Sequence, residues 1–277
     1  MDDFNSFEKM LYQSSKLNLD RSRFSSTWLK LDCPQKFPHL SQQCISIFWN
    51  RPNFRKMNSL NQKLDEARKN LYSAVLSDTL DSMGLLNQVL EPGIRPIDES
   101  KVLCGWARVG LYFPIYHDDE TVNVYEHELK LIDSLKPDEV PVLICHGLKH
   151  IAPWGELLST RAEYLKAGGC ITDGSVRDVR MIREMGFPLY AGNISPLDTK
   201  YRGKLMWSDV PGKIHGVSVQ SGDLIFGDVD GVLVVPGEHV ETALEKAFEK
   251  VSQENVVRQK LQEGQTLEQI FADHGIL

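Results

Sequence analysis

The chain has 277 residues, of which 42% are hydrophobic and 25% are charged, as in an ordinary globular protein. Its formal net charge of −7 excludes a general attraction to nucleic acid or to anionic membranes, so we expect neither as a partner. No apolar run reaches the roughly 18 residues that a membrane span needs. The five cysteines lie far apart and form no C-x-x-C motif, which predicts free thiols in a reducing, cytoplasmic setting.

Residues 1–56 differ in composition from the rest of the chain. They are rich in Ser, Asn, Gln, Phe and Pro and hold 9 basic and 5 acidic residues, whereas residues 57–277 hold 22 and 33. Such a shift usually marks a boundary. We therefore expect a poorly structured extension over 1–56 and one folded domain over 57–277. Trp28, Phe48 and Trp49 leave open that part of the extension docks on the domain.

Helical and strand patterns alternate from residue 57 to residue 192. Helices are predicted over about 60–70, 73–83, 121–135, 155–169 and 176–186. Strands are predicted over about 104–114, 139–147, 170–172 and 187–192. This β-α-β-α-β order indicates an α/β fold with parallel strands joined by helical crossovers.

The pattern changes after residue 205. Short apolar runs are split there by S-G-D and D-V-D-G turns, which predicts antiparallel hairpins. We interpret D-V-D-G at 228–231 as a turn and not as a calcium loop, because the spacing of an EF-hand is absent. A final helix is predicted from near Glu238, with apolar residues at helical spacing. They are Val240, Ala243, Leu244, Ala247, Phe248 and Val251.

The segment 168–178 predicts a candidate site. "GGCIT" (168–172) is typical of a buried strand, "DG" (173–174) of a tight turn, and Ser175 of a helix N-cap. Arg177 and Asp178 would then lie in the first turn of the next helix, beyond the carboxyl end of a strand, where α/β proteins bind ligands. A purely structural alternative remains open, because the macrodipole favours an early Asp and Arg177 could form a surface ion pair.

The segment 150–160 repeats this arrangement. Gly155 precedes a helix that begins near Glu156, and the backbone N–H groups of Glu156, Leu157 and Leu158 would form a cradle for a carboxylate. The side chain of Glu156 could face a metal-bound water or could be a capping or surface acid. Two adjacent strands that each end in glycine and a helix start predict one shared pocket.

Four segments together resemble a known enzyme family. They are 154–178, which contains the G-x-x-x-D-G-x-x-R-D pattern, and 76–84, 186–198 and 222–236. The chain resembles, over roughly residues 70–265, the class II pyruvate aldolases of the 4-hydroxy-4-methyl-2-oxoglutarate/4-carboxy-4-hydroxy-2-oxoadipate type. Their relatives include the regulators of ribonuclease activity A. The resemblance implies a swivelling β/β/α-type single domain, with a parallel βαβ core and antiparallel hairpins, assembled as a homotrimer or hexamer.

The resemblance also implies residue roles. Asp178 resembles the direct ligand of Mg²⁺ or Mn²⁺, and Arg177 resembles the residue that contacts the keto oxygen of pyruvate. The backbone of 155–158 resembles the carboxylate cradle, and Glu156 an acid that holds metal-bound water. In this family a further acid comes from the C-terminal helix of a neighbouring subunit. Glu254 matches it best, although it could equally be a solvated glutamate.

These residue roles, together with a divalent cation, are suited to cleavage of a carbon–carbon bond next to a 2-keto group. The reaction generates a pyruvate enolate, whose charge a divalent cation and Arg177 would stabilise. The base would be a metal-associated water held by Glu156 and Glu254. Oxaloacetate decarboxylation is expected as a companion activity. A Schiff-base mechanism is less expected, because Lys149 and Lys166 are not predicted to be desolvated.

An alternative function remains from the sequence. A non-catalytic regulator that binds an RNA-processing enzyme could share the fold and lose the metal site. The presence of Glu156, Arg177 and Asp178 favours the enzyme. The physiological substrate is not determined by the sequence.

Overall fold

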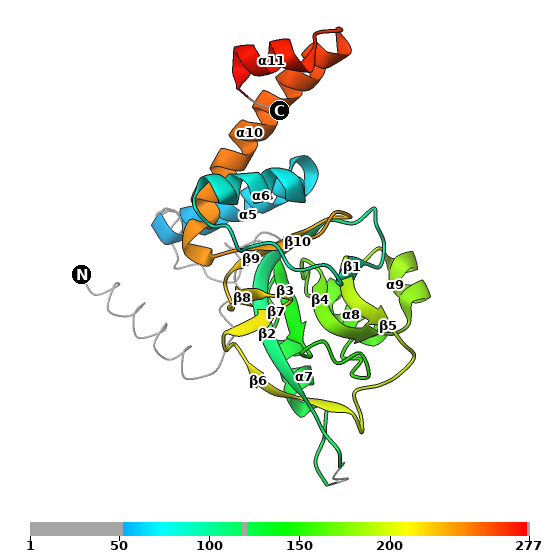
Figure 1. Cartoon of the computed structure of the whole chain (residues 1–277). Helices are drawn as coiled ribbons and strands as arrows, with labels where there is room; N and C mark the ends of the chain where they lie inside the picture. Colours follow the sequence, from blue (N-terminus) through cyan, green and yellow to red (C-terminus); the bar gives the residue numbers. More distant parts are fainter. Residues whose placement is uncertain (1–51, 118–120, 276–277) are drawn as a thin grey trace, which may run out of the picture. The chain divides into compact units, whose positions relative to one another are not determined.

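The computed structural model describes residues 52–117 and 121–275, without the side chains of 52–59 and 274. One compact unit begins at Asn58 and is built on an eight-stranded mixed sheet (Figure 1). Its strand order is β1-β5-β4-β3-β2-β9-β10, with β6 paired to β2. The predicted extension, with Trp28, Phe48 and Trp49, lies almost wholly outside the described residues, so the boundary near residue 57 stays a prediction.

The strands fall into two sheets. The large sheet contains β1 (Arg95–Pro96), β2 (Leu103–Pro114), β3 (Glu139–Ile144), β4 (Cys170–Val176), β5 (Leu189–Ile194), β6 (Gly203–Ser208), β9 (Leu224–Gly227) and β10 (Val232–Val235). The small sheet is the hairpin of β7 (Gly212–Ile214) and β8 (Val217–Val219). Strands β2 to β5 are parallel, as predicted, while β1, β6, β9 and β10 pair antiparallel.

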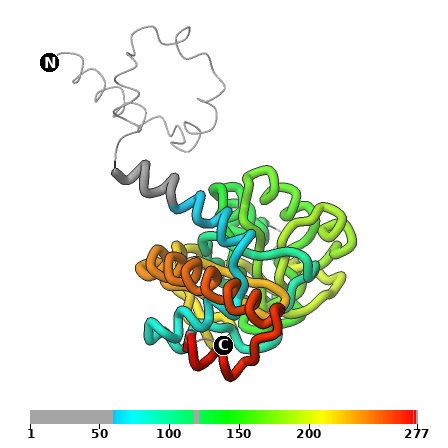
Figure 2. The backbone as a smooth tube through the Cα atoms, turned by 90° about the horizontal axis from the view of Figure 1, so that it is seen from above, coloured from blue at the N-terminus to red at the C-terminus, as the bar shows by residue number. Residues whose placement is uncertain are grey.

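The described helices lie around the large sheet, except the last one. They are α5 (Pro52–Asn70), α6 (Ser73–Ser82), α7 (Glu126–Asp133), α8 (Glu156–Tyr164), α9 (Val179–Met185), α10 (Val240–Gln262) and α11 (Leu267–His274), with a 3₁₀ turn at Gly237–His239. Figure 1 shows α11 at the far end of α10, away from the sheet. Residues of α6, α10 and α11 line one groove, and these three helices lie on the same side in the view from above (Figure 2).

Strand β2 organises the sheet. One of its edges pairs with β3, and its other edge pairs first with β9, over Leu103–Trp106, and then with β6, over Gly110–Pro114. A register shift between Leu111 and Tyr112 interrupts the pairing with β6. Such irregularities bend a strand and increase its twist. The sheet therefore forks along β2 and curls.

The sheet is buried on both faces. Strand β3 illustrates this, because Val142 and Ile144 join a core shared with the β7–β8 hairpin, whereas Leu143 joins the core under α7, α8 and α9. A third core lies between β9, β10 and the helices α5, α6 and α10. Near-continuous apolar runs are typical of strands covered on both sides, which explains the segment 139–147.

Several predictions in the second half of the chain are confirmed. The hairpins β7–β8 and β9–β10 are antiparallel, and residues 228–231 make the connection between β9 and β10. Helix α10 buries Val240, Ala243, Leu244 and Ala247, while Phe248 and Val251 pack against the same core. Strands β1 and β6 and helix α11 were not predicted.

Two predicted helices are shorter in the structure. The helix expected over 121–135 begins only at Glu126, and the helix expected over 155–169 ends at Tyr164. Ser159 and Ala162 are the residues of this helix that face the core, whereas 77% of the surface of Leu157 is exposed.

The turn predicted at 173–174 and the helix N-cap predicted at Ser175 were also wrong. Strand β4 runs through Ser175 and Val176, so 173–174 is not a turn, and a register shift between Thr172 and Ser175 accommodates these residues within the pairing with β5. The hydroxyl of Ser175 donates to the backbone oxygen of Lys149 instead of capping a helix. Helix α9 starts at Val179, which leaves Arg177 and Asp178 in the connection before it.

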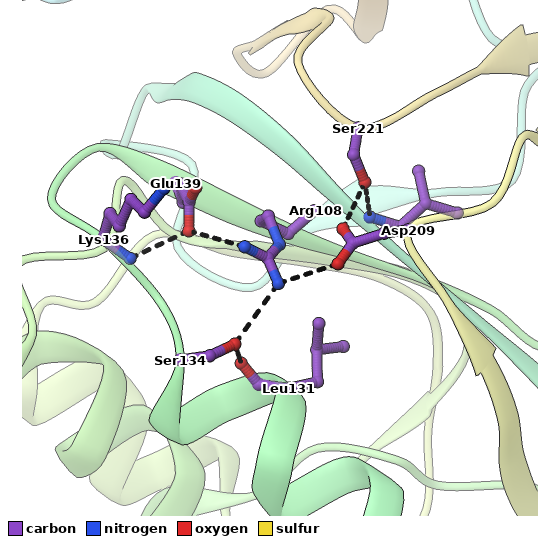
Figure 3. A network of polar contacts seen from close by, with 8 residues as sticks. Arg108, Leu131, Ser134, Lys136, Glu139, Asp209 and Ser221 are labelled. Atoms are coloured by element: carbon purple, nitrogen blue, oxygen red, sulfur yellow. Dashed lines mark hydrogen bonds and ion pairs between the residues drawn. The ribbon is translucent and has the colours of Figure 1, made fainter. Parts of the chain in front are cut away.

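A partly buried polar cluster surrounds Arg108 (Figure 3). The Nη2 atom of Arg108 lies 3.2 Å from Ser134 Oγ, at the end of α7, and 3.0 Å from Asp209 Oδ2, beyond β6. Its Nη1 atom lies 3.6 Å from Glu139 Oε2, at the start of β3. Ser221 Oγ in turn donates to Asp209. The guanidinium therefore links β2 to three elements that pack around it.

We predict that Arg108→Ala lowers the free energy of unfolding by about 1–3 kcal/mol, because Glu139 would keep a largely buried carboxylate without its cation. Arg161→Ala is the matched control, since the pair of Arg161 with Asp133 is exposed and should contribute below about 1 kcal/mol. Urea denaturation measures both. Equal effects of the two substitutions would contradict the prediction.

Candidate functional site

The start of α8 lies beside the connection between β4 and α9. Trp154 and Val176 form an isolated parallel bridge, and the N–H of Arg177 donates to the backbone oxygen of Trp154 at 3.0 Å. Because these bonds hold the two segments in register, Gly155 and Asp178 meet directly after the bridge. The backbone pairing therefore brings together the two segments from which a shared pocket was predicted, and the pocket itself stays a prediction.

Gly155 allows the close approach of these segments. A Cβ atom at this position would lie 2.8 Å from Asp178 Oδ2 and 3.1 Å from Arg177 Cγ. The φ angle of −151° is open to any residue, so the requirement is space and not backbone conformation. A glycine is needed because both charged side chains pack onto the bare backbone.

Asp178 caps helix α8, although it belongs to the next crossover. Its Oδ2 atom accepts a hydrogen bond from the N–H of Glu156 at 3.2 Å and lies 3.7 Å from Nε of Arg177. The positive end of the helix dipole favours a carboxylate there. Asp178 itself has a φ of 59°, in the left-handed region that Asp tolerates.

The predicted carboxylate cradle is partly occupied by the protein itself. The N–H of Glu156 is donated to Asp178, whereas the N–H groups of Leu157 and Leu158 belong to the same first turn, where a helix supplies no acceptors. The carboxylate of Glu156 accepts a hydrogen bond from Thr160 Oγ1 at 2.7 Å. This contact turns the Glu156 side chain along its own helix.

Arg177 has a second acidic neighbour that the sequence did not predict. Its Nη1 atom lies 3.5 Å from Asp198 Oδ2, and the hydroxyl of Tyr125 donates to that same oxygen at 2.7 Å. Burial opposes ionisation of Asp198, but the Tyr125 hydrogen bond and the charge of Arg177 lower its pKa below the usual value. Burial and Asp198 raise the pKa of Tyr125, so its hydroxyl remains a donor.

Glu128 is a buried acid behind this group. Only 7% of its surface is exposed, and Tyr112 Oη donates to Glu128 Oε2 at 2.6 Å. Burial raises the pKa of Glu128 to about 7; the hydrogen bond from Tyr112 opposes this shift, and the negative charge of Asp198 adds to it. The side chain is therefore poised between its neutral and charged forms near neutral pH.

A sequence signal could have identified Glu128. Val124, Glu128, Leu131, Ile132 and Leu135 are all buried at the spacing of one helical face. An acid within such an apolar stripe is unusual and indicates either a partner or a shifted pKa. No comparable pattern marks Tyr125 or Asp198, which reach Arg177 from distant parts of the chain.

Glu254 lies elsewhere in the protomer. It is on α10 and accepts a hydrogen bond from the hydroxyl of Tyr72. The described contacts within one chain do not bring it to Arg177 or Asp178. A role at the site would require another subunit and stays a prediction.

The carboxylate of Asp178 is suited to bind a cation that has few other protein ligands. Within the described ranges, no group of three or more His, Cys, Asp or Glu side chains is arranged to hold a metal ion. Both described side-chain contacts of Asp178 fall on Oδ2, which leaves Oδ1 available. Mg²⁺ usually keeps several waters and binds through one or two carboxylates, so Asp178 fits a site completed by water and substrate.

Comparison with known proteins gives the family. A family model described as RraA-like, Aldolase/RraA, matches residues 73–234, which is more than half of the chain. The chain belongs to the Aldolase/RraA family. The family predicted from the sequence motifs is therefore confirmed.

Two individual relatives illustrate the similarity. "Protein DlpA" of Legionella pneumophila is 29% identical over 238 residues, which cover 85% of this chain and 38% of that protein; the chain thus spans well under half of its length. A protein of Halalkalibacterium halodurans named "Putative 4-hydroxy-4-methyl-2-oxoglutarate aldolase" is 32% identical over 63% of this chain and 77% of its own.

A solved structure shares the fold. RraAS2 of Streptomyces coelicolor, described as an unusual member of the RNase ES inhibitor RraA protein family, superposes with a TM-score of 0.63 at 23% identity. The match covers 71% of this chain and 96% of that one. This likeness confirms the predicted α/β fold with its parallel core and hairpins.

None of the described helices is long and apolar enough to cross a membrane.

We predict that Glu128→Gln flattens the pH dependence of stability. The folded state holds the Glu128 proton up to a pKa of about 7, against 4.5 for an unperturbed glutamate, so wild-type stability should fall as the pH rises from 4.5 through 7. The loss should be on the order of 3 kcal/mol and absent in the Gln variant. Urea denaturation at several pH values measures the slope.

Glu126→Gln is the control for this experiment, because Glu126 is an exposed neighbour on the same helix. Its slope between about pH 5 and 8 should match that of the wild type, within the few tenths of a kcal/mol expected of surface substitutions. An unchanged slope in Glu128→Gln would show that Glu128 is ionised in the folded protein.

Proposed function

We propose that this chain is a carbon–carbon lyase that cleaves 4-hydroxy-2-keto acids, of the 4-hydroxy-4-methyl-2-oxoglutarate type, to pyruvate and a second keto compound. The observation that carries the proposal is the contact of Gly155 with Arg177 and Asp178, which assembles a cation, a carboxylate and a helix N-terminus at one point. The name of the Halalkalibacterium relative supports the same substrate class.

Each element of the site has a role in this reaction. The first turn of α8 binds the substrate carboxylate through backbone N–H groups, including those of Leu157 and Leu158. Arg177 donates to the keto oxygen and stabilises the negative charge that develops there when the bond breaks. Asp178 would hold a divalent cation, Mg²⁺ or Mn²⁺, which supplies Lewis-acid polarisation of the keto oxygen.

Glu156 and Glu254 are the proposed carboxylates that would hold the water acting as the base for the C4 hydroxyl. Glu156 lies in the first turn of α8, and its hydrogen bond from Thr160 fixes one carboxylate oxygen. Glu254 would come from a neighbouring subunit, since its own protomer places it against Tyr72. This part of the proposal therefore requires a homotrimer or hexamer. Proton removal from the C4 hydroxyl then starts the cleavage.

The same chemistry extends to decarboxylation. Loss of CO₂ from oxaloacetate leaves the pyruvate enolate, which Arg177 and the cation at Asp178 would stabilise in the same way. We therefore propose oxaloacetate decarboxylase activity as a companion activity, and this substrate provides a simple assay.

We predict that the purified protein releases pyruvate from oxaloacetate with Mg²⁺ or Mn²⁺ and that EDTA abolishes this release. Asp178→Ala should lower kcat/KM by about 100- to 1000-fold, because it removes the side chain proposed to hold the cation. Coupling to lactate dehydrogenase measures the pyruvate. Asp133→Ala, at an exposed acid of α7, is the control and should retain activity. Full activity of Asp178→Ala would overturn the assignment.

We predict that Gly155→Ala lowers kcat on the order of 100-fold, since the added methyl group would displace both Asp178 and Arg177. Gly231→Ala is the matched control, because a Cβ atom there would meet nothing within 4 Å. Steady-state kinetics measure kcat, and thermal denaturation checks folding. A Gly155→Ala variant with wild-type kcat would show that the close contact is not needed for activity.

The alternative is a non-catalytic regulator that binds an RNA-processing enzyme. The description of RraAS2 names an RNase ES inhibitor family, which makes this a reasonable second candidate. It predicts no pyruvate release by the wild type and a complex that forms without metal. Asp178→Ala would leave such a complex intact, so one variant separates the two functions.

A further inference from the structure

We propose that Asp198 and Tyr125 are positioning residues that hold the guanidinium of Arg177 in the orientation needed to receive the keto acid. This inference rests on the proposed function, because it names the residues that set the geometry of the same site. The two side chains come from the segment between β5 and β6 and from the start of α7. Neither forms part of the matched R-D pattern.

Arg177 depends on its neighbours for orientation. It lies in the connection between β4 and α9, so no helix or strand pairing restricts its side chain. Its described polar contacts are on Nε, 3.7 Å from Asp178 Oδ2, and on Nη1, 3.5 Å from Asp198 Oδ2. The guanidinium is planar and rigid, so these two ion pairs on different nitrogens favour one orientation of its plane. Nη2 is then available for a substrate oxygen.

Tyr125 fixes the acid that faces Arg177. Its hydroxyl donates at 2.7 Å to Asp198 Oδ2, the same oxygen that lies nearest to Nη1. The backbone of Tyr125 is itself held, because it is the N-cap of α7 and its N–H donates to Asn123 Oδ1 at 3.0 Å. A hydrogen bond to a charged acceptor is stronger than one between neutral groups. The fixed start of α7 therefore holds the Tyr125 hydroxyl in place, the hydroxyl holds Asp198, and Asp198 restricts the guanidinium of Arg177.

The surroundings favour this interpretation over a solvated surface pair. Asp198 and Arg177 have about a third of their side-chain surfaces exposed, so the pair is only partly screened by water. Behind them lies the buried carboxyl of Glu128, which is bound to Tyr112. Asp198 Oδ2 therefore has two partners, the guanidinium of Arg177 and the hydroxyl of Tyr125, and loss of the hydroxyl leaves Asp198, and with it Arg177, less constrained.

The test uses Tyr125→Phe and Asp198→Asn in the full chain. Tyr125→Phe removes only a hydroxyl, and Asp198→Asn removes the charge while keeping an acceptor. Tyr201→Phe is the matched control, because Tyr201 lies three positions from Asp198 with its ring under Lys200. Thermal denaturation verifies that all variants fold.

The first measurement is independent of catalysis. Phenylglyoxal modifies free guanidinium groups, and peptide mass spectrometry separates Arg177 from Arg180, an internal reference on α9. We expect Arg177 to be modified about fivefold faster in both variants, the factor expected when Tyr125→Phe removes one hydrogen bond and Asp198→Asn removes one partly exposed ion pair. The rate at Arg180 should not change.

The second measurement is binding and turnover. Oxalate, a planar dianion that resembles an enolate, is titrated calorimetrically in the presence of Mg²⁺. We expect its affinity to fall about fivefold in both variants and kcat for oxaloacetate to fall about tenfold, with a smaller change in KM. Tyr201→Phe should match the wild type in both respects.

The outcomes separate the two proposals. If Tyr125→Phe and Asp198→Asn match Tyr201→Phe in Arg177 modification and in oxalate affinity, the positioning role is wrong, whether or not the wild type is a lyase. If Arg177 becomes more reactive in both variants while the wild type releases no pyruvate from any 2-keto acid, the positioning role stands and the proposed function fails.

Discussion

The candidate site depends on the close packing of two chain segments at Gly155. Because this residue has no side chain, Asp178 and Arg177 lie directly on the backbone at the start of α8. Asp178 then reaches the N–H of Glu156, so a residue of one crossover caps the helix of another. The bridge between Trp154 and Val176 enforces this contact. Replacing the hydrogen by any side chain would separate the groups on which the proposed chemistry relies.

The positive charge of Arg177 is balanced by carboxylates close to it. Arg177 lies between Asp178 and Asp198, and the hydroxyl of Tyr125 shares the second of these carboxylates. Behind them, burial keeps Glu128 partly protonated near neutral pH, which limits the negative charge that faces Arg177. An isolated guanidinium would be oriented by water; here it is oriented by two acids that come from different parts of the sequence.

The curled sheet explains why these parts meet. The parallel strands β3, β4 and β5 place the helix starts of α8 and α9 at one edge of the sheet, as open α/β sheets do for their ligand sites. The fork of β2 brings β6 back along the same strand, and the segment that leads into β6 carries Asp198. Tyr112 on β2 and Glu128 on α7 meet beneath it.

The sequence by itself indicated the family through a compact motif. Local periodicity and turn residues predicted the parallel core, the antiparallel hairpins and the closeness of segments 150–160 and 168–178. The sequence misplaced the start of α9, since pairing with β5 extended β4 through Ser175 against the local preference for a cap. Only the tertiary structure decided that Tyr125, Glu128 and Asp198 gather around Arg177. Contacts between residues up to 73 positions apart depend on how the sheet folds, and no local pattern encodes them.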